Sequence, residues 1–309
     1  MNLSLKIEKS LIKASTSYPT DRITAFKKAL AQEDDENAIW ALKLMLKNAK
    51  IANKKKLPLC DDTGIPHVFI ELGKNRNISG EFLEDIKKGI ANGLKNLPGR
   101  PMAVKGNDLE RISQSKGLFN ESEKLASPSF LIDNFDNEHL NSNLNSKLDS
   151  NLNNNLNNNL NINLDDKIRI HLLLLGGGPE IRANTYRVFH KRDYKEVLNV
   201  AIDRFKESLS LLGCTPCIPA IGIGRTHYEA NSLLIKAMVY GNLNIQSDIE
   251  RYITDEINKT NIGPMGLGGK TSSLGSFVKI GPQRASGVRI LATRPCCFIE
   301  PRVATIEID

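Results

Sequence analysis

The chain has 309 residues, 40% of them apolar and 25% charged, which is enough to bury the core of one or two domains. No apolar run reaches the roughly 18 residues of a membrane-spanning helix, and the first residues lack the apolar core of a secretory signal, so we expect a cytoplasmic protein. The net charge of +7 comes from scattered lysines with one tight cluster at Lys54–Lys56, which favours a solvated basic surface over nucleic-acid binding.

The N-terminal part of the chain is predicted to be helical up to about Lys55. Thr20 or Asp21 can cap a helix that begins after Pro19, and a second helix is predicted over 37–53. A turn-rich loop, a short strand and a third helix are predicted to follow, over residues 57–64, 68–72 and 80–94.

The segment over 133–166 is of low complexity and rich in asparagine. Leucine recurs at every fourth residue from Leu140 to Leu164, and this period exceeds the roughly 3.6 residues of a helical turn. The leucines would therefore spiral around a helix, and asparagine is itself a weak helix former. The pattern predicts a disordered insertion between two core elements, without a function of its own.

Strands and helices alternate in the remainder of the chain. Strands are predicted at 167–175, at 218–223, near Phe277 and near Val288. Helices are predicted over 194–212, 229–239 and 247–258. This alternation predicts a mixed α/β fold, in which the helical N-terminal part packs on a mixed sheet within one domain over 1–309.

The five cysteines lie at three stations along the chain, namely Cys60, Cys214 with Cys217, and Cys296 with Cys297. Clustered cysteines in a reducing compartment indicate a metal or redox site rather than disulfides. A four-thiolate zinc site would need two ligands from an adjacent pair, and a thioredoxin-like motif would open a helix, whereas Cys214 follows one. A cluster held by one cysteine from each station fits better, because it leaves one iron free to act as a Lewis acid.

Two glycine-rich segments only partly match nucleotide-binding loops. The segment that ends in Gly269–Thr271 looks like a phosphate-binding loop, but Pro264 stands where that loop needs a glycine. The segment Gly222–Gly224 is followed by Arg225, so the dinucleotide fingerprint fails as well. We interpret both segments as tight turns.

Several loops together indicate a family. The nine residues Gly263–Thr271 read Gly-Pro-Met-Gly-Leu-Gly-Gly-Lys-Thr, and the other informative segments are Pro58–Gly64, Gly99–Val104, Gly176–Ile181, Gly213–Pro216, Gly222–Thr226, and Cys297 with Arg302. In this order they resemble the alpha subunits of class I (iron–sulfur) fumarate hydratases and L-tartrate dehydratases, over nearly the whole chain. The chain differs from the family at Asp61, where the family has glutamine, and at Gln283, where it has a histidine that contacts the active site.

The resemblance implies a 4Fe–4S cluster bound by Cys60, Cys214 and Cys297, with Cys296 as the alternative third ligand. It implies a hydro-lyase that reversibly adds water to the double bond of a dicarboxylate, with fumarate and malate as the first choice. L-tartrate or another hydroxy acid is the alternative substrate. A non-catalytic protein that binds zinc or a cluster in a structural or regulatory role is the alternative from another class.

The resemblance also implies how a substrate would be held. Arg100 would bind one carboxylate through its bidentate guanidinium, and main-chain N–H groups around Gly177 would bind the other. Asp62 would position the substrate hydroxyl or carry its proton. Asp61 and Lys270 are expected to face the substrate.

A partner subunit is expected as well. Single-chain members of the family carry a second domain that supplies part of the active site, and this sequence reaches Asp309 without one. We therefore expect a separate beta subunit that completes the site, in a dimer of alpha–beta pairs that binds neither nucleic acid nor a membrane.

Overall fold

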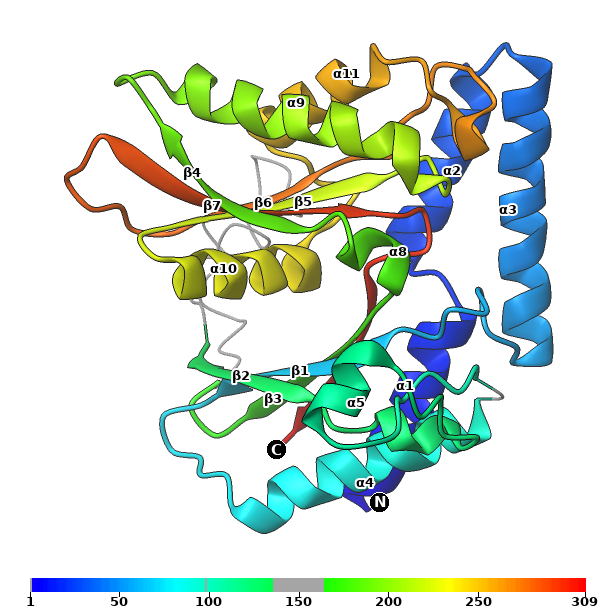
Figure 1. Ribbon diagram of the computed structural model, residues 1–309, viewed down its shortest axis with the longest axis vertical. Coiled ribbons are helices and arrows are strands. Elements are labelled where there is room, and N and C mark those ends of the chain that lie inside the picture. Colours follow the sequence, from blue (N-terminus) through cyan, green and yellow to red (C-terminus); the bar gives the residue numbers. More distant parts are fainter. Residues whose placement is uncertain (1, 98, 136–163) are drawn as a thin grey trace, which may run out of the picture.

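The computed structural model describes residues 2–97, 99–135 and 164–309, in alternating layers of helix and sheet (Figure 1). The helices are α1 (Leu3–Thr16), α2 (Thr20–Gln32), α3 (Glu36–Lys55), α4 (Gly80–Asn96), α5 (Asp108–Ser113), α8 (Gly177–Glu180), α9 (Tyr194–Leu212), α10 (His227–Tyr240) and α11 (Asp248–Asn258). The strands are β1 (Ile65–Leu72), β2 (Ser129–Asn134), β3 (Ile168–Leu175), β4 (Asn184–Phe189), β5 (Ile218–Gly224), β6 (Phe277–Ile280), β7 (Val288–Cys296) and β8 (Arg302–Ile308).

The described strands form two four-stranded sheets, with the strand orders β2-β1-β3-β8 and β4-β7-β5-β6. Each sheet has one parallel pair at an edge, β1 with β2 and β5 with β6, and its other pairs are antiparallel. Parallel neighbours need a crossover connection, and helices α4 and α10 lie in these two connections.

The chain passes between the two sheets twice, and both passages lie at the same end of the strands. One leads from β3 to β4 through α8, and the other leads from β7 to β8 through residues 297–301. The register pairs Ile65 with Leu175, Leu174 with Arg302, and Ile218 with Cys296. The loops before β1 and β5 therefore gather at the same end as the two passages (Figure 1).

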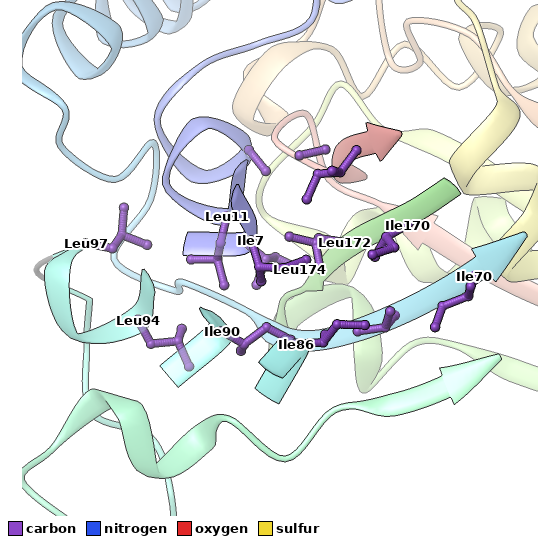
Figure 2. Packing of buried hydrophobic residues seen from close by; sticks show 14 of the residues in the cluster. Ile7, Leu11, Ile70, Ile86, Ile90, Leu94, Leu97, Ile170, Leu172 and Leu174 are labelled. Atoms are coloured by element: carbon purple, nitrogen blue, oxygen red, sulfur yellow. The ribbon is translucent and has the colours of Figure 1, made fainter. Parts of the chain in front are cut away.

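Helices α1 and α4 cover the outer face of the first sheet, and Figure 2 shows the apolar side chains between these layers. The Ser79 side chain caps α4 by accepting the N–H of Phe82 at 3.2 Å. Ile86, Ile90 and Leu94 follow at four-residue spacing, and all three are buried. Full burial of one such side chain contributes roughly 1.5–3 kcal/mol, which is why this face of the helix faces the sheet.

Helix α10 lies between the two sheets, and α9 with α11 covers the outer face of the second sheet (Figure 1). The inner cluster joins both sheets to α10 and includes Phe69, Leu173, Ile218, Leu234, Met238 and Cys296. Helices α2 and α3 pack against the loops at the end where the chain crosses between the sheets, in a cluster that includes Tyr18, Phe26, Leu42, Leu59 and Phe298.

The expected mixed α/β fold is confirmed, and the predicted helices and strands are present near their predicted bounds. The strands form two sheets where a single sheet was expected. At the predicted start of the insertion, Asp133 and Asn134 belong to β2 and pair with Glu71 and Leu72 of β1. Its residues 136–163 lie outside the described part of the chain.

No helix within the described ranges is long and apolar enough to cross a membrane.

Candidate functional site

Three loops that carry cysteine meet at the end of the sheets where the chain crosses between them. Cys60 lies shortly before β1, Cys297 follows β7, and Cys214 follows α9 through Gly213, whose positive φ of 72° ends the helix. The N–H of Phe298 donates to the carbonyl oxygen of Cys214 at 3.3 Å, which joins the second and third loops. Cys60 and Cys297 also pack against the same apolar cluster.

Each station has one cysteine residue that is partly or fully exposed, namely Cys60, Cys214 and Cys297. The other two thiols are buried in different places. The Sγ atom of Cys296 lies 3.7 Å from the Sδ atom of Met238, in the core between α10 and the sheets, whereas Cys217 belongs to the core under α9. A four-thiolate zinc site would need at least one of these buried thiols beside the other three, and the described residues contain no group of three or more His, Cys, Asp or Glu side chains placed to bind one metal ion.

Burial raises the pKa of the thiols of these three cysteines. It raises the pKa of Cys60 and of Cys214, and burial together with Glu300 raises the pKa of Cys297 to about 12. A thiol binds a metal as the thiolate, so metal binding here would release protons. In the part of the chain that the structure describes, no three or more His, Cys, Asp or Glu side chains are arranged for a single metal ion. In a 4Fe–4S cluster each thiolate binds a different iron, so the cysteine ligands lie farther apart than the ligands of a single metal ion.

Asp62 is fixed between the first cysteine loop and the glycine loop that follows β3. Its Oδ2 atom accepts the N–H of Gly177 at 2.7 Å, and its Oδ1 atom accepts the N–H of Gly64 at 3.1 Å. The Nη1 atom of Arg302 donates to the carbonyl oxygen of Asp62 at 2.7 Å. The main chain of α8 therefore holds the carboxylate of Asp62, and a side chain from β8 holds its main chain, two residues after Cys60.

A buried ion pair supports the glycine loop from behind. Arg294 and Glu300 are 2% and 1% exposed, and the Nε atom of Arg294 lies 3.0 Å from Oε2 of Glu300. Arg294 also donates to the carbonyl oxygen of Gly176 at 2.9 Å, and the N–H of Gly176 donates to Glu300. A Cβ at Gly176 would lie only 2.9 Å from Asp62 Oδ2 and from Glu300 Oε1, so this position requires glycine.

Asp61 and Arg100 form an ion pair with each other. The Nη1 atom of Arg100 lies 3.0 Å from Oδ2 of Asp61, and both side chains are exposed. The Cys60 Sγ atom lies 3.5 Å from the other carboxylate oxygen of Asp61. The guanidinium expected to bind a substrate carboxylate thus holds a carboxylate of the protein, next to the first cysteine.

Lys270 has its contacts at the corner between α2 and α3. Its Nζ atom lies 2.6 Å from Oδ2 of Asp34, and its N–H donates to Glu33 at 2.8 Å. The glycine-rich loop before it reaches the second cysteine loop, since the N–H of Met265 donates to the carbonyl oxygen of Thr215 at 2.9 Å. The structure therefore brings this loop to the site, but it pairs the lysine side chain with Asp34.

Gln283 lies at the opposite end of the second sheet from the cysteines. Its Nε2 atom donates to the carbonyl oxygen of Ile223, near the end of β5, at 3.2 Å, whereas Cys214 precedes the start of that strand. A strand rises about 3.3 Å per residue, so the length of β5 separates this glutamine from the cysteine loops of its own chain.

Sequence reasoning missed two residues that pack behind the cysteine loops. Arg22 is buried and donates to three main-chain carbonyl oxygens in the turn 298–301. The ring of Tyr18 lies over its guanidinium, with the Cζ atom 5.6 Å from the ring centroid. The one signal in the sequence is spacing, because Arg22 lies one helical turn before Phe26 and so shares the buried face of α2.

A family model described as fumarate hydratase (Fumerase) matches residues 4–307. A Methanocaldococcus jannaschii protein with the provisional name L(+)-tartrate dehydratase subunit alpha is 27% identical over 319 residues, which cover 100% of this chain and 99% of that protein.

Two further relatives differ in length. A Geobacillus stearothermophilus protein with the provisional name fumarate hydratase class I is 26% identical over 87% of this chain, which spans only 48% of that protein. The L(+)-tartrate dehydratase subunit alpha of Escherichia coli K12 is 19% identical, over 91% of this chain and 83% of its own length.

Proposed function

This chain belongs to the fumarate hydratase family of hydro-lyases, and on that premise we propose that it is the alpha subunit of an enzyme that reversibly hydrates fumarate to malate. One observation carries the proposal. Three cysteines that are far apart in the sequence, each at least partly exposed, lie on loops that meet beside a fixed carboxylate and an exposed guanidinium.

Cys60, Cys214 and Cys297 would hold a 4Fe–4S cluster. Thiolates are the usual ligands of such clusters, and three of them leave one iron without a protein ligand. When bound, the cluster supplies a Lewis acid that polarises a substrate oxygen. Cys297 is preferred over Cys296 as the third ligand, because the Cys296 thiol is enclosed in the core against Met238.

The side chains around these loops suit an anionic substrate. Arg100 is exposed and can bind a substrate carboxylate with both arms of its guanidinium once Asp61 releases it. The N–H of Gly177 donates to the carboxylate of Asp62, so it could bind a substrate carboxylate only in place of Asp62. Asp62 would accept a hydrogen bond from the substrate hydroxyl or carry its proton. Lys270 would have to leave Asp34 before it could reach the substrate.

L-tartrate is the second candidate substrate, and the names of the relatives favour it. The M. jannaschii protein matches this chain from end to end and is named for tartrate, as is the E. coli protein, whereas the G. stearothermophilus protein is named for fumarate. Both reactions move water across a carbon–carbon bond next to a carboxylate, so the same residues would serve either substrate.

A separate beta subunit is part of the proposal. Two relatives are named as alpha subunits, and we propose that a beta subunit completes the site of this chain within a dimer of alpha–beta pairs. The cytoplasmic location stays a prediction from the sequence.

Anaerobic reconstitution with iron and sulfide tests the proposal. We expect a brown protein with absorption at roughly 400 nm, and turnover of fumarate, L-malate or L-tartrate once a candidate beta subunit is added. A protein that takes up no iron would refute the cofactor, and a loaded protein that turns over none of the three acids with its partner would refute the activity. Full activity of this chain alone would refute the need for a beta subunit.

A further inference from the structure

Unpaired buried polar atoms gather behind the cysteine loops. Six side-chain N or O atoms in the described residues are buried without a hydrogen-bond partner, and four of them belong to Ser15, Tyr18, Arg22 and Arg302. Ser15 lies against the first cysteine loop, since its carbonyl oxygen accepts the N–H of Leu59 at 2.9 Å. Burying polar atoms without partners is costly, so their concentration at one place points to a group that these residues are built to contact.

Two of these residues are buried cations without an anionic partner. Arg22 and Arg302 are 2% and 4% exposed, and both donate to main-chain carbonyl oxygens, of the turn 298–301 and of Asp62. The ion pairs among the described residues include neither guanidinium, and the carboxylate of the neighbouring Asp21 accepts a main-chain N–H instead. A buried cation is expensive unless negative charge lies nearby, and thiolates on the adjacent loops would supply that charge.

Tyr18 lies close to both cations and to two of the thiols. Its ring stacks on Phe26, with 5.6 Å between the centroids, and covers the guanidinium of Arg22. Burial raises the pKa of Tyr18, and the charge of Arg22 opposes this rise. Charge on Cys297 and Cys60 adds to the rise, so both thiols lie near the hydroxyl. That hydroxyl has no acceptor among the residues described.

Two of these residues, Tyr18 and Arg302, face a common space. Tyr18 and Arg302 line one cavity of about 460 Å³ together with residues of the turn that follows the third cysteine. We propose that Tyr18, Arg22 and Arg302 are positioning residues for the cysteine ligands of the cluster. The hydroxyl and guanidinium N–H groups donate toward sulfur, and the two positive charges offset the thiolates. This inference rests on the proposed function, because it requires that the cluster is bound.

The expected effect is on the reduction potential of the cluster. Reduction adds negative charge, and hydrogen bonds to sulfur and nearby positive charge stabilise the more negative state. These three residues should therefore raise the potential and make the cluster easier to reduce. A residue that only filled the core would leave the potential unchanged.

The test compares Y18F, R302Q and R302K with the control Y186F, all reconstituted anaerobically with iron and sulfide. Tyr186 on β4 is a matched control, because its hydroxyl is also buried without a partner and Arg204 lies 5.2 Å from its ring centroid. The readouts are iron content and the midpoint potential from an EPR-monitored titration. We expect R302Q to weaken the stabilisation of the reduced cluster about tenfold. For a one-electron couple this lowers the midpoint potential by about 59 mV. Y18F should cause a smaller fall, and R302K and Y186F should match the wild type.

The possible results distinguish a failure of this inference from a failure of the proposed function. Loaded Y18F and R302Q proteins with the wild-type potential would overturn this inference and leave the proposed function intact. A wild-type chain that binds no cluster would overturn both. Thermal unfolding of the cluster-free proteins shows whether R302Q still folds; if it does not, Y18F alone decides, and a wild-type potential in Y18F overturns the inference.

Discussion

Cys296 and Cys297 are adjacent in the sequence but lie in different environments. The thiol of Cys296 is enclosed in the core against Met238, whereas Cys297 is a partly exposed residue at the cysteine loops. We expect C297A to lose the iron that the wild type takes up, whereas C296A should keep most of it. Iron and sulfide analysis after anaerobic reconstitution measures both variants. The reverse result, loss of iron in C296A alone, would make Cys296 the ligand.

On the proposed function, the ion pair between Asp61 and Arg100 competes with the substrate for the guanidinium of Arg100. An exposed ion pair contributes roughly 0.2–1 kcal/mol, so D61Q should lower the KM for a dicarboxylate by up to about fivefold because Arg100 is then free to bind it. Steady-state kinetics of the loaded complex with its beta subunit measures this change.

D34N is the matched control for D61Q. It frees Lys270 from a similar exposed ion pair at the corner between α2 and α3. An unchanged KM in D34N together with a lower KM in D61Q would localise the effect to Arg100. An equal fall in both variants would show that the effect is not specific to the Asp61–Arg100 pair, because released Lys270 would then bind the substrate as well.

At the residue scale, the sequence is informative about residues whose chemistry is rare. The three cysteine stations each lie within two residues of a proline or glycine, which makes Cys60, Cys214 and Cys297 stand out from the sequence alone. Tyr18 and Arg22 do not stand out, since their significance comes from burial and from missing partners, which depend on neighbours far away in the sequence. For the same reason the pairing of Lys270 with Asp34 was not predictable.

At the scale of elements, the contact between α1 and α4 depends on a glycine. A Cβ at Gly89 would lie 2.6 Å from the Cβ of Ile7 and 2.5 Å from the carbonyl oxygen of Ser4. We expect G89A to lower the free energy of unfolding by about 1–3 kcal/mol through overpacking, despite the better helix propensity of alanine. Urea unfolding of the cluster-free chain measures the change.

G80A is the control for this prediction. Gly80 is the first residue of α4, and a Cβ there would have no neighbour within 4 Å. G80A should therefore be as stable as the wild type or more stable. A G89A protein that is no less stable than G80A would show that the two helices can move apart without cost.

Long elements were predictable, and short ones were not. Helix α9 spans many turns with apolar residues at helical spacing, so its bounds Tyr194–Leu212 follow directly from the sequence. Strand β4 is a short edge strand in which only Val188 is fully buried, and it therefore carries no clear alternation. Which strands pair is decided by contacts between distant segments, so the division into two sheets could not be read from local pattern.

At the scale of the whole molecule, a buried polar network joins the first sheet to α10. Glu71 is 1% exposed, and its carboxylate lies 2.8 Å from Nε2 of His171, 3.3 Å from Arg169 and 2.7 Å from the hydroxyl of Tyr240. Burial alone would raise the pKa of Glu71, but the hydrogen bonds from His171 and Tyr240 and the charge of Arg169 outweigh it and lower the pKa below its ordinary value of 4.5.

This network predicts how stability depends on pH. The folded state binds the Glu71 proton more weakly than the unfolded state does, so the contribution of Glu71 is fully present above pH 4.5 and is lost as the pH falls through the lowered pKa. Y240F removes one of the hydrogen bonds and should move this loss to higher pH. Denaturant unfolding between pH 3 and 7 (roughly the range of carboxylate titration) measures it, and identical profiles for Y240F and the wild type would contradict the prediction.

The second sheet is inserted, in chain order, between β3 and β8 of the first. During synthesis on the ribosome, β1 and β3 emerge long before β8, which pairs with β3. That edge of β3 therefore stays unpaired until the second sheet has been synthesised. Cys297 emerges just ahead of that closing strand. On the proposed function, the three cluster ligands are all present only after every strand of both sheets except β8 has been made, so a shorter nascent chain would lack one of the thiols.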